Sequence, residues 1–290
     1  MLNPFNPPHP IFWLICPTHQ LKNMINALFS SKPGGTKSFL MDGVTFGWSS
    51  IIKMFERECE RINSGSTRMV PKLKEVHVIR DAWTKLNVTP AKIMQQENVL
   101  TELFSYLHDN PNQSLSDGTK AVLSYLESCS KIFENGFLSH SKITDINCDT
   151  MKSINEGYKF FTRWLDQIRC QDSSFDLKVN TQTKFLAWQT FDLLRIDIYG
   201  FNMFCKHFLK KHPGYFVSPL RVSGSAVETL FSQFKYSSGG KLDAANYGYS
   251  RAVSLVKQVT STHHSGKDYR DGQLHINNLP LTKKVYNKKD

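Results

Sequence analysis

Residues 184–211, KFLAWQTFDLLRIDIYGFNMFCKHFLKK, decide the fold class, because they predict one long helix within a block of helices. Apolar residues recur along this stretch at helical spacing, and the same pattern, with little alternation, extends over residues 70–208. The sequence His212-Pro213-Gly214 ends the long helix, since proline lacks the backbone donor and glycine tolerates left-handed geometry. The middle of the chain is therefore predicted to be all-helical.

Two further sets of residues in this block have the spacing of a helix face. One set consists of Leu73, Val76, His77, Arg80, Trp83 and Leu86, and the other of Tyr158, Phe161, Trp164, Leu165 and Ile168. Four aromatic side chains fall on such helical stripes, where core packing is a commoner role than base stacking: Trp83, Trp164, Trp188 and Phe191. We expect these four side chains in the core.

On the N-terminal side, the helical block is preceded by segments that mix strands with helices. The bulky run at residues 11–16, between two prolines, predicts a buried strand, and residues 21–28 predict a helix. Residues 39–48 predict a second strand, and the periodic residues 51–59 predict a second helix. This flank therefore has the pattern of an α/β core.

The C-terminal flank repeats this mixture on a smaller scale. Residues 215–222 predict a short strand, and a helix follows over residues 227–234, with Ser223 or Ser225 as its cap. The pair Gly239-Gly240 breaks that helix, and residues 245–256 predict one more. The tail, residues 261–290, has six basic and three acidic residues with few large apolar ones, and is predicted to be disordered.

The composition favours a folded protein with polyanionic partners. The 290 residues include 36 Lys and Arg against 25 Asp and Glu, a formal charge of +11, and 40% are hydrophobic. No apolar run approaches the roughly 20 residues of a membrane span, and the proline-rich start lacks the features of a secretory signal. We therefore expect an intracellular protein with no membrane association. The six cysteines are sparse and include no Cys-x-x-Cys pair, so we expect free thiols, most of them buried.

Two short stretches resemble a known family. Residues 16–23, CPTHQLKN, resemble the Asp-Pro-x-His-x-x-Lys-x-x-Arg-Asn segment of the P-element family of transposases, which includes the THAP-type transposases. Residues 223–232, SGSAVETLFS, with the later Gly-Gly pair, are similar to that family's Ser-Gln-Asp-x-x-Glu-x-x-Phe helix and Gly-Gly turn. Residues 46–58 look like the segment before the family's helical insertion, so the resemblance covers roughly residues 10–256.

The resemblance implies a mainly α fold: a partial RNase H-like α/β core interrupted by a large all-helical insertion domain. In the family, this insertion is associated with guanine-nucleotide binding. The corresponding domains are residues 1–62 and 213–260 for the two sides of the core, 63–212 for the insertion and 261–290 for the disordered basic tail. The strand at residues 11–16 would leave an unpaired edge, so we also expect self-association.

The resemblance implies metal-dependent DNA strand transfer in the family, but this sequence departs from the family's catalytic residues. Such chemistry uses about three carboxylates to hold two divalent ions. Cys16 occupies the position of a family Asp, and a mainly neutral, soft thiol cannot replace a carboxylate as a Mg²⁺ ligand. In the family, the first acid lies on an earlier strand, which we expect to be missing here, and only Glu228 matches a catalytic position. We expect no transposase activity and no resident cofactor; Glu228 would be a remnant, or simply a solvated helix-face acid.

Any DNA contact must then come from diffuse basic charge, which gives weak, salt-sensitive binding. Lys235, Lys241 and Arg251 flank the Gly-Gly turn and are the candidate DNA-binding residues; the alternative is a merely solvated basic surface. No Cys/His set has zinc-finger spacing. The nearest cluster, Cys205 with His207 and His212, is read as a core thiol with surface histidines.

Two further signals bear on nucleotides and localisation. The stretch GGTKS at residues 34–38 superficially resembles a phosphate-binding loop, but its spacing fails, so we interpret residues 30–38 as a loop that ends a helix. GTP binding, known in the family, therefore stays a hypothesis without named ligands. The lysine pairs at 283–284 and 288–289 could form a nuclear import signal, although a solvated end is the commoner meaning.

Three functions remain open at this stage. The first is a truncated, catalytically inactive P-element-like transposase fragment, derived from a transposable element, with residual DNA and GTP binding. The second is a helical protein-interaction module with no nucleic-acid role. The third is the product of a decayed element with no function. A salt-dependent DNA titration separates the first two hypotheses.

Overall fold

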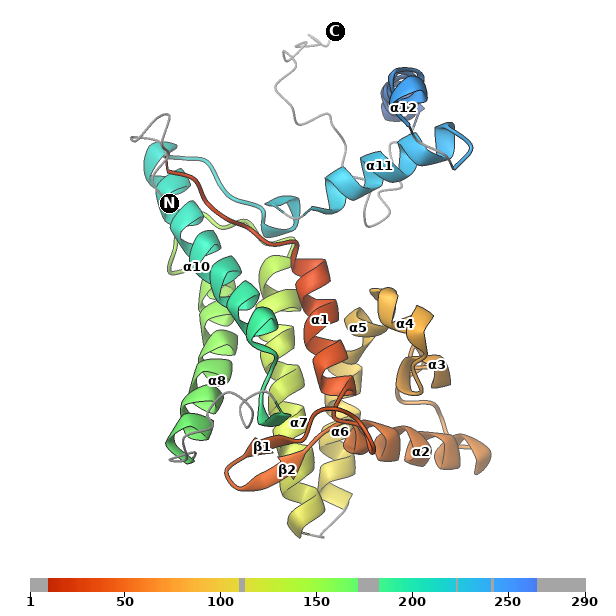
Figure 1. The fold of residues 1–290 in the computed structure, drawn as a ribbon, viewed down its shortest axis with the longest axis vertical. Helices are drawn as coiled ribbons and strands as arrows, with labels where there is room; N and C mark the ends of the chain where they lie inside the picture. The colour runs from red at the N-terminus through yellow and green to blue at the C-terminus, as the bar shows by residue number, and fades with distance from the viewer. Residues whose placement is uncertain (1–9, 110–112, 172–182, 223, 241–242, 265–290) are drawn as a thin grey trace, which may run out of the picture. The chain divides into compact units, whose positions relative to one another are not determined.

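The computed structural model describes residues 10–109, 113–171, 183–222, 224–240 and 243–264. These residues form a mainly α-helical fold with one two-stranded sheet, which confirms the expected fold class (Figure 1). The chain divides into two units, Met1–Ser223 and Gly224–Asp290. The four-domain division proposed above stays a prediction.

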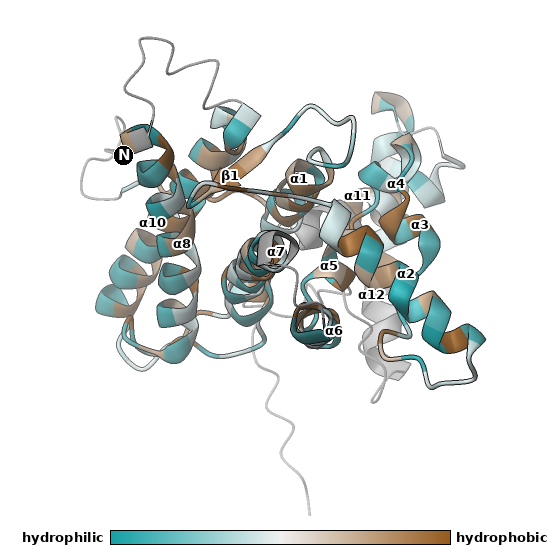
Figure 2. Cartoon of the chain, turned by 90° about the horizontal axis from the view of Figure 1, so that it is seen from below, coloured by the Kyte–Doolittle hydropathy of each residue, from teal (hydrophilic) through white to brown (hydrophobic). Residues whose placement is uncertain are grey.

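The first unit contains most of the helices. They are α1 (Pro17–Phe29), α2 (Ser49–Asn63), α3 (Glu75–Val78), α4 (Ala82–Leu86), α5 (Thr89–Met94), α6 (Glu97–Asp109), α7 (Gln113–Ile132), α8 (Asp149–Gln171) and α10 (Trp188–Lys211). A π-helical turn, Phe133–Phe137, continues α7. Figure 2 shows α7 in the middle of this unit, with α1, α6 and α8 around it.

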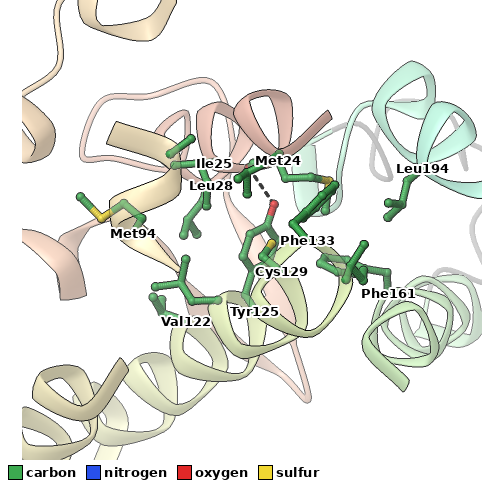
Figure 3. Packing of buried hydrophobic residues seen from close by; sticks show 14 of the residues in the cluster. Met24, Ile25, Leu28, Met94, Val122, Tyr125, Cys129, Phe133, Phe161 and Leu194 are labelled. Atoms are coloured by element: carbon green, nitrogen blue, oxygen red, sulfur yellow. Dashed lines mark hydrogen bonds between the residues drawn. The ribbon is translucent and has the colours of Figure 1, made fainter. Parts of the chain in front are cut away.

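The core of the first unit is built around α7. Tyr125 is fully buried there, and its hydroxyl donates a hydrogen bond to the backbone carbonyl of Met24 on α1, at 2.8 Å (Figure 3). A buried Tyr hydroxyl needs such a partner, so this bond fixes how α7 faces α1. Phe161 and Trp164 of α8 pack edge-on against the same ring. These contacts join α7 and α8 to α1, and Tyr125 lies 101 residues after Met24 in the sequence.

The predicted strand at residues 39–48 is a β-hairpin instead. Strands β1 (Phe39–Met41) and β2 (Val44–Phe46) pair antiparallel, with Phe39 opposite Phe46. Asp42 and Gly43 both have positive φ, 51° and 79°, as a two-residue type I′ turn requires. The Asp-Gly pair therefore turns the chain where the sequence analysis expected one continuous strand.

The strand predicted at residues 11–16 is wrong. This segment is not paired with any strand in the described residues; it lies along α10 instead. The Ile15 N–H donates to a side-chain oxygen of Asp197, and the Phe12 ring packs edge-on to Phe204. A Cβ added to Gly200 would lie 2.0 Å from the Trp13 carbonyl oxygen, so only glycine permits this approach. The segment is backed by a helix, and the unpaired strand edge expected there is absent.

The helix predicted through Leu73 and Leu86 is also wrong, because two short helices, α3 and α4, replace it. Ile79 has ψ of 87°, outside the helical range, and ends α3. Asp81 then caps α4 by accepting a hydrogen bond from the Thr84 N–H at 2.6 Å. A capping Asp favours a new helix start over continuation of the old one.

Of the four aromatic residues expected in the core, two are exposed. Trp164 and Phe191 are buried, whereas Trp83 is 80% exposed and Trp188 is 62% exposed. Trp83 lies on α4, and Trp188 is the first residue of α10. The helical spacing of these two residues therefore does not mean that their side chains are buried.

The long helix α10 starts later than predicted, at Trp188 rather than residue 184, and ends at Lys211 as predicted. Phe185 and Leu186 are drawn into the core, and Ala187 is extended, with ψ of 139°, so the helix begins after it. The strand predicted at residues 215–222 is wrong: Val217 forms an isolated bridge with Ile143, and a 3₁₀ turn, Pro219–Val222, follows.

A buried ionic network joins α2 to α6. Glu58 is fully buried, and one of its carboxylate oxygens accepts hydrogen bonds from the backbone N–H groups of Met69 and Val70, at 2.7 and 3.0 Å. Arg61 pairs with Glu58 at 3.0 Å and also with the buried carboxylate of Glu102. The Glu58 carboxylate therefore has two backbone N–H donors and one cation as partners, as a buried charge requires.

The second unit contains α11 (Ser225–Ser237) and α12 (Ala244–His264). Gly224 is the N-cap of α11, without a side-chain capping bond, so neither predicted serine cap is confirmed. Gly239 and Gly240, with φ of 66° and 91°, turn the chain after α11, as predicted. Residues 261–264, placed in the tail by the sequence analysis, belong to α12, and residues 265–290 lie outside the described part.

Candidate nucleic-acid interface

Cys16 ends the extended N-terminal segment and begins α1. It is the N-cap of the helix, with φ of −61° and ψ of 111°, and Pro17 occupies the first helical position. This order is physically favourable, because proline at that position has a fixed helical φ and no amide to leave unsatisfied. The thiol is half-buried. The residue that the resemblance matches to a family Asp therefore lies at a helix N-terminus.

A buried carboxyl group, Asp197 of α10, lies next to this segment. Its Oδ1 accepts the Ile15 N–H at 3.0 Å, its Oδ2 has no hydrogen-bond partner, and the residue is 1% exposed. Burial raises the pKa of Asp197 to about 7, because water no longer stabilises the charged form. Near neutral pH, much of this acid is therefore uncharged, which suits packing better than metal binding.

Sequence reasoning missed Asp197, although the sequence contains a signal. Leu194, Ile198 and Phe201 form a helical apolar stripe, and Asp197 lies within it, three residues after Leu194 and four before Phe201. An acid inside an apolar stripe is unusual enough to mark a buried, hydrogen-bonded carboxyl group. The partner, a backbone N–H near residue 16, could not be identified from spacing.

Glu228, the predicted catalytic remnant, belongs to helix α11 of the second unit. Its backbone is helical, and its side chain lies outside the described part of the structure. Cys16 belongs to the first unit. The role of Glu228 therefore stays a prediction.

Two of the three predicted DNA-binding residues are described, and both are exposed. Lys235 lies in the last turn of α11, and Arg251 lies in α12. Lys241 lies outside the described residues. The two helices pack through the buried Phe234 ring, which meets Tyr247 edge-on with 5.5 Å between ring centroids. Helices α11 and α12, which carry the two cations, therefore pack against each other as a pair.

Exposed aromatic side chains accompany these cations. Tyr236 follows Lys235 and is 82% exposed, and Tyr249 lies two residues before Arg251 and is 70% exposed. This helix pair therefore exposes both cations and aromatic rings, the two kinds of group that bind a nucleic-acid backbone and stack on its bases. The cations were predicted from the sequence, but the rings were not.

The Cys205, His207 and His212 cluster is packed into the protein. Cys205 is fully buried, and burial raises the pKa of its thiol to about 12, which confirms the core thiol. His207 packs on the ring of Phe12, and His212 on that of Phe208. Both histidines are half-buried rather than on the surface as expected. All six cysteines are free, as predicted, but two of them are buried, not most: Cys129 and Cys205.

The loop at residues 30–38 ends helix α1, as interpreted from the sequence. Its backbone closes on itself, with the Lys37 N–H donating to the Ser30 carbonyl at 3.0 Å. The Lys37 ammonium donates to the carbonyl of Phe185 at 3.0 Å, and burial lowers its pKa. This lysine therefore anchors the loop to the segment before α10.

None of the helices in the described ranges has both the length and the apolar character needed to cross a bilayer. Among the same residues, no three His, Cys, Asp or Glu side chains converge as a metal-ligand set.

The chain has a transposase-like fold. Its structure is similar to a solved structure described as the Drosophila P element transposase strand transfer complex, with a TM-score of 0.60 and 10% sequence identity. The similarity covers 84% of this chain and 51% of that chain, so this chain spans about half the length of its structural neighbour. No protein-family model matches the sequence, and no curated protein matches it. At this identity the likeness shows the fold alone.

Proposed function

We propose that this chain is a transposable-element-derived, DNA-binding protein that lacks the strand-transfer activity of P-element-like transposases. The observation that carries the proposal is the transposase-like fold together with an exposed set of cations and aromatic rings on α11 and α12. The formal charge of +11 supports attraction to a polyanion.

Catalytic inactivity follows from the chemistry of Cys16. A metal-dependent nuclease or transposase site needs oxygen ligands for Mg²⁺, and a thiol is a poor substitute. The test incubates the full chain with labelled transposon-end DNA and Mg²⁺ or Mn²⁺, beside a Glu228→Ala variant. We expect no cleavage or joining by either protein. Product formed by the parent chain and lost in the variant refutes inactivity.

DNA binding through Lys235 and Arg251 is tested by salt dependence. Each cation that neutralises a phosphate of duplex DNA adds about 0.9 to the slope of log K against log salt. The double variant Lys235→Met/Arg251→Met should therefore lower the slope by up to about 1.8 and weaken binding for all sequences alike. Fluorescence anisotropy of a labelled duplex, at several salt concentrations, measures both quantities.

A matched control removes the same charges elsewhere. Lys159 and Arg163 are exposed on α8, so Lys159→Met/Arg163→Met also deletes one lysine and one arginine from a helix. We expect the slope for this control to stay at the parent value. Equal losses for the two double variants would mean that net charge alone drives binding, and would overturn the assignment to α11 and α12.

A protein-interaction module is the second candidate function, and exposed apolar residues favour it. Val76, Ile79 and Leu86, on and between α3 and α4, are 55%, 66% and 65% exposed, and Trp83 lies among them. Several exposed apolar residues within one short segment are typical of protein contacts. The salt titration decides: a slope near zero, or no binding, favours this module.

GTP binding enters the proposal through the resemblance, without assigned residues. A ligand that binds the native state raises its melting temperature. Stabilisation by GTP beyond that by ATP would support a guanine-specific site. An equal rise in melting temperature with both nucleotides, or no rise with GTP at millimolar concentration, would contradict a guanine-specific site.

A further inference from the structure

Arg80 is a buried cation whose guanidinium nitrogens have no hydrogen-bond partner among the described residues. The residue is 5% exposed, and Nε, Nη1 and Nη2 are all buried without a hydrogen-bond partner. Arginine carries five N–H donors and stays charged, so burial without partners is costly. Arginines in protein interiors are normally paired with carboxylates or bound to anions. This one is satisfied by neither in the described residues.

The adjacent acid does not serve Arg80. The Asp81 carboxylate turns to α4, where it accepts hydrogen bonds from the N–H and hydroxyl of Thr84, both at 2.6 Å. Desolvation lowers the pKa of Arg80 to about 10, whereas a neighbouring carboxylate would raise it.

Two exposed lysines lie over the same aromatic ring as Arg80. The distances to the centroid of the Phe29 ring are 5.7 Å from the Arg80 guanidinium carbon, 5.0 Å from Lys32 Nζ and 5.1 Å from Lys85 Nζ. Three like charges repel one another, and a single ring compensates each of them only weakly. An anion among them would neutralise this repulsion.

Nearby groups show that the positive potential extends beyond these three side chains. His77, at the end of α3, has a lowered pKa because it is buried and because Lys74 and Arg80 disfavour its protonated form. The region thus combines one buried cation, two exposed ones and a histidine held toward its neutral form.

We infer that Arg80, Lys32 and Lys85 form a binding site for a phosphate group. Phosphate matches the planar donor fork of arginine, and lysines add charge from the exposed side. The two sources of such a group are a nucleic-acid strand and a free polyphosphate. The site lies in the first unit and differs from the cations of α11 and α12, so it stands independently of the DNA-binding residues proposed above.

The test measures melting temperature of the full chain in sodium pyrophosphate against sodium chloride of equal ionic strength. At a concentration tenfold above Kd, we expect a rise of about 3–6 °C, which should continue to grow with the logarithm of the pyrophosphate concentration. Arg80→Met, which keeps the aliphatic length, should lose this rise while melting at or above the parent temperature in chloride, because an unpaired buried charge is gone. Arg163→Met, an exposed arginine on α8, is the matched control and should keep the full rise.

The two exposed lysines of the site, Lys32 and Lys85, give a second variant that does not disturb the core. Lys32→Met/Lys85→Met should fold normally and bind pyrophosphate at least fivefold more weakly. A parallel arm with a short single-stranded oligonucleotide identifies the source: stabilisation by either anion that depends on Arg80 supports the site. No stabilisation of the parent chain by either anion, or equal stabilisation of parent and Arg80→Met, overturns it. Lys235→Met/Arg251→Met should keep the pyrophosphate response, which separates this site from the proposed function.

Discussion

Replacing Asp197 by asparagine should remove much of the pH dependence of stability. The carboxyl group has a pKa of about 7 in the folded protein, against an ordinary value of 3.8, because it is buried on α10. Between these two values, the folded state holds a proton that the unfolded state has released. Stability therefore falls as pH rises from about 4 to about 7 and is level above that range.

The size of the effect follows from the same pKa difference. Each pKa unit corresponds to about 1.4 kcal/mol, so raising the pH from about 5 to about 8 should cost the parent protein about 3 kcal/mol from this group. For a folded unit the size of Met1–Ser223, that loss lowers the melting temperature by about 6–12 °C. Asparagine has no charged form, and its side-chain oxygen can still accept the Ile15 N–H.

Urea unfolding of both proteins at pH 5 and pH 8 measures this difference directly. The control is Asp192→Asn, on the same helix, whose partner is Arg195 at 3.0 Å and whose side chain is 37% exposed. We expect the pH-dependent loss to shrink by about 3 kcal/mol in Asp197→Asn and to persist in the control. An unchanged loss in Asp197→Asn would refute the assignment of a raised pKa to this residue.

Three substitutions test other features by urea or thermal unfolding. Cys16→Asp should stabilise the chain by about 1 kcal/mol, because a carboxylate is a far better N-cap acceptor than a thiol; destabilisation would contradict the capping geometry. Glu58→Ala should cost about 3 kcal/mol, since it leaves the Met69 and Val70 amides without their acceptor and Arg61 with only one of its two carboxylates; a loss below 1 kcal/mol would mean that water replaces the carboxylate. Gly200→Ala should cost about 1–3 kcal/mol despite the helix preference of alanine, because its Cβ meets the Trp13 carbonyl; a gain in stability would show that residues 11–16 do not pack there.

Helix periodicity and turn residues were reliable where the local signal was strong. The end of α10 at Lys211 and the turn after α11 follow from glycine and proline, whose backbone preferences act without distant partners. The Asp42-Gly43 turn had an equally local signal, which the sequence analysis did not use. These features are encoded within a few residues.

The candidate sites were predicted unevenly for a similar reason. Lys235 and Arg251 could be named from sequence because exposed cations need no partner. Arg80 could not be recognised, since what distinguishes it is burial without hydrogen-bond partners, and for Asp197 the apolar stripe indicates burial but not the hydrogen-bond partner. Such a property depends on groups from other elements.

The sequence by itself determined the mainly α class, the helical middle of the chain and the positive charge, because periodicity and composition are local or additive. Tertiary structure alone decided that residues 11–16 lie on α10 rather than in a sheet, and that the stretch around Arg80 breaks into two helices. A short apolar run is compatible with either a strand or a helix-packed segment, and its partners choose between them. Here those partners are Asp197 and Gly200, nearly two hundred residues away in the chain.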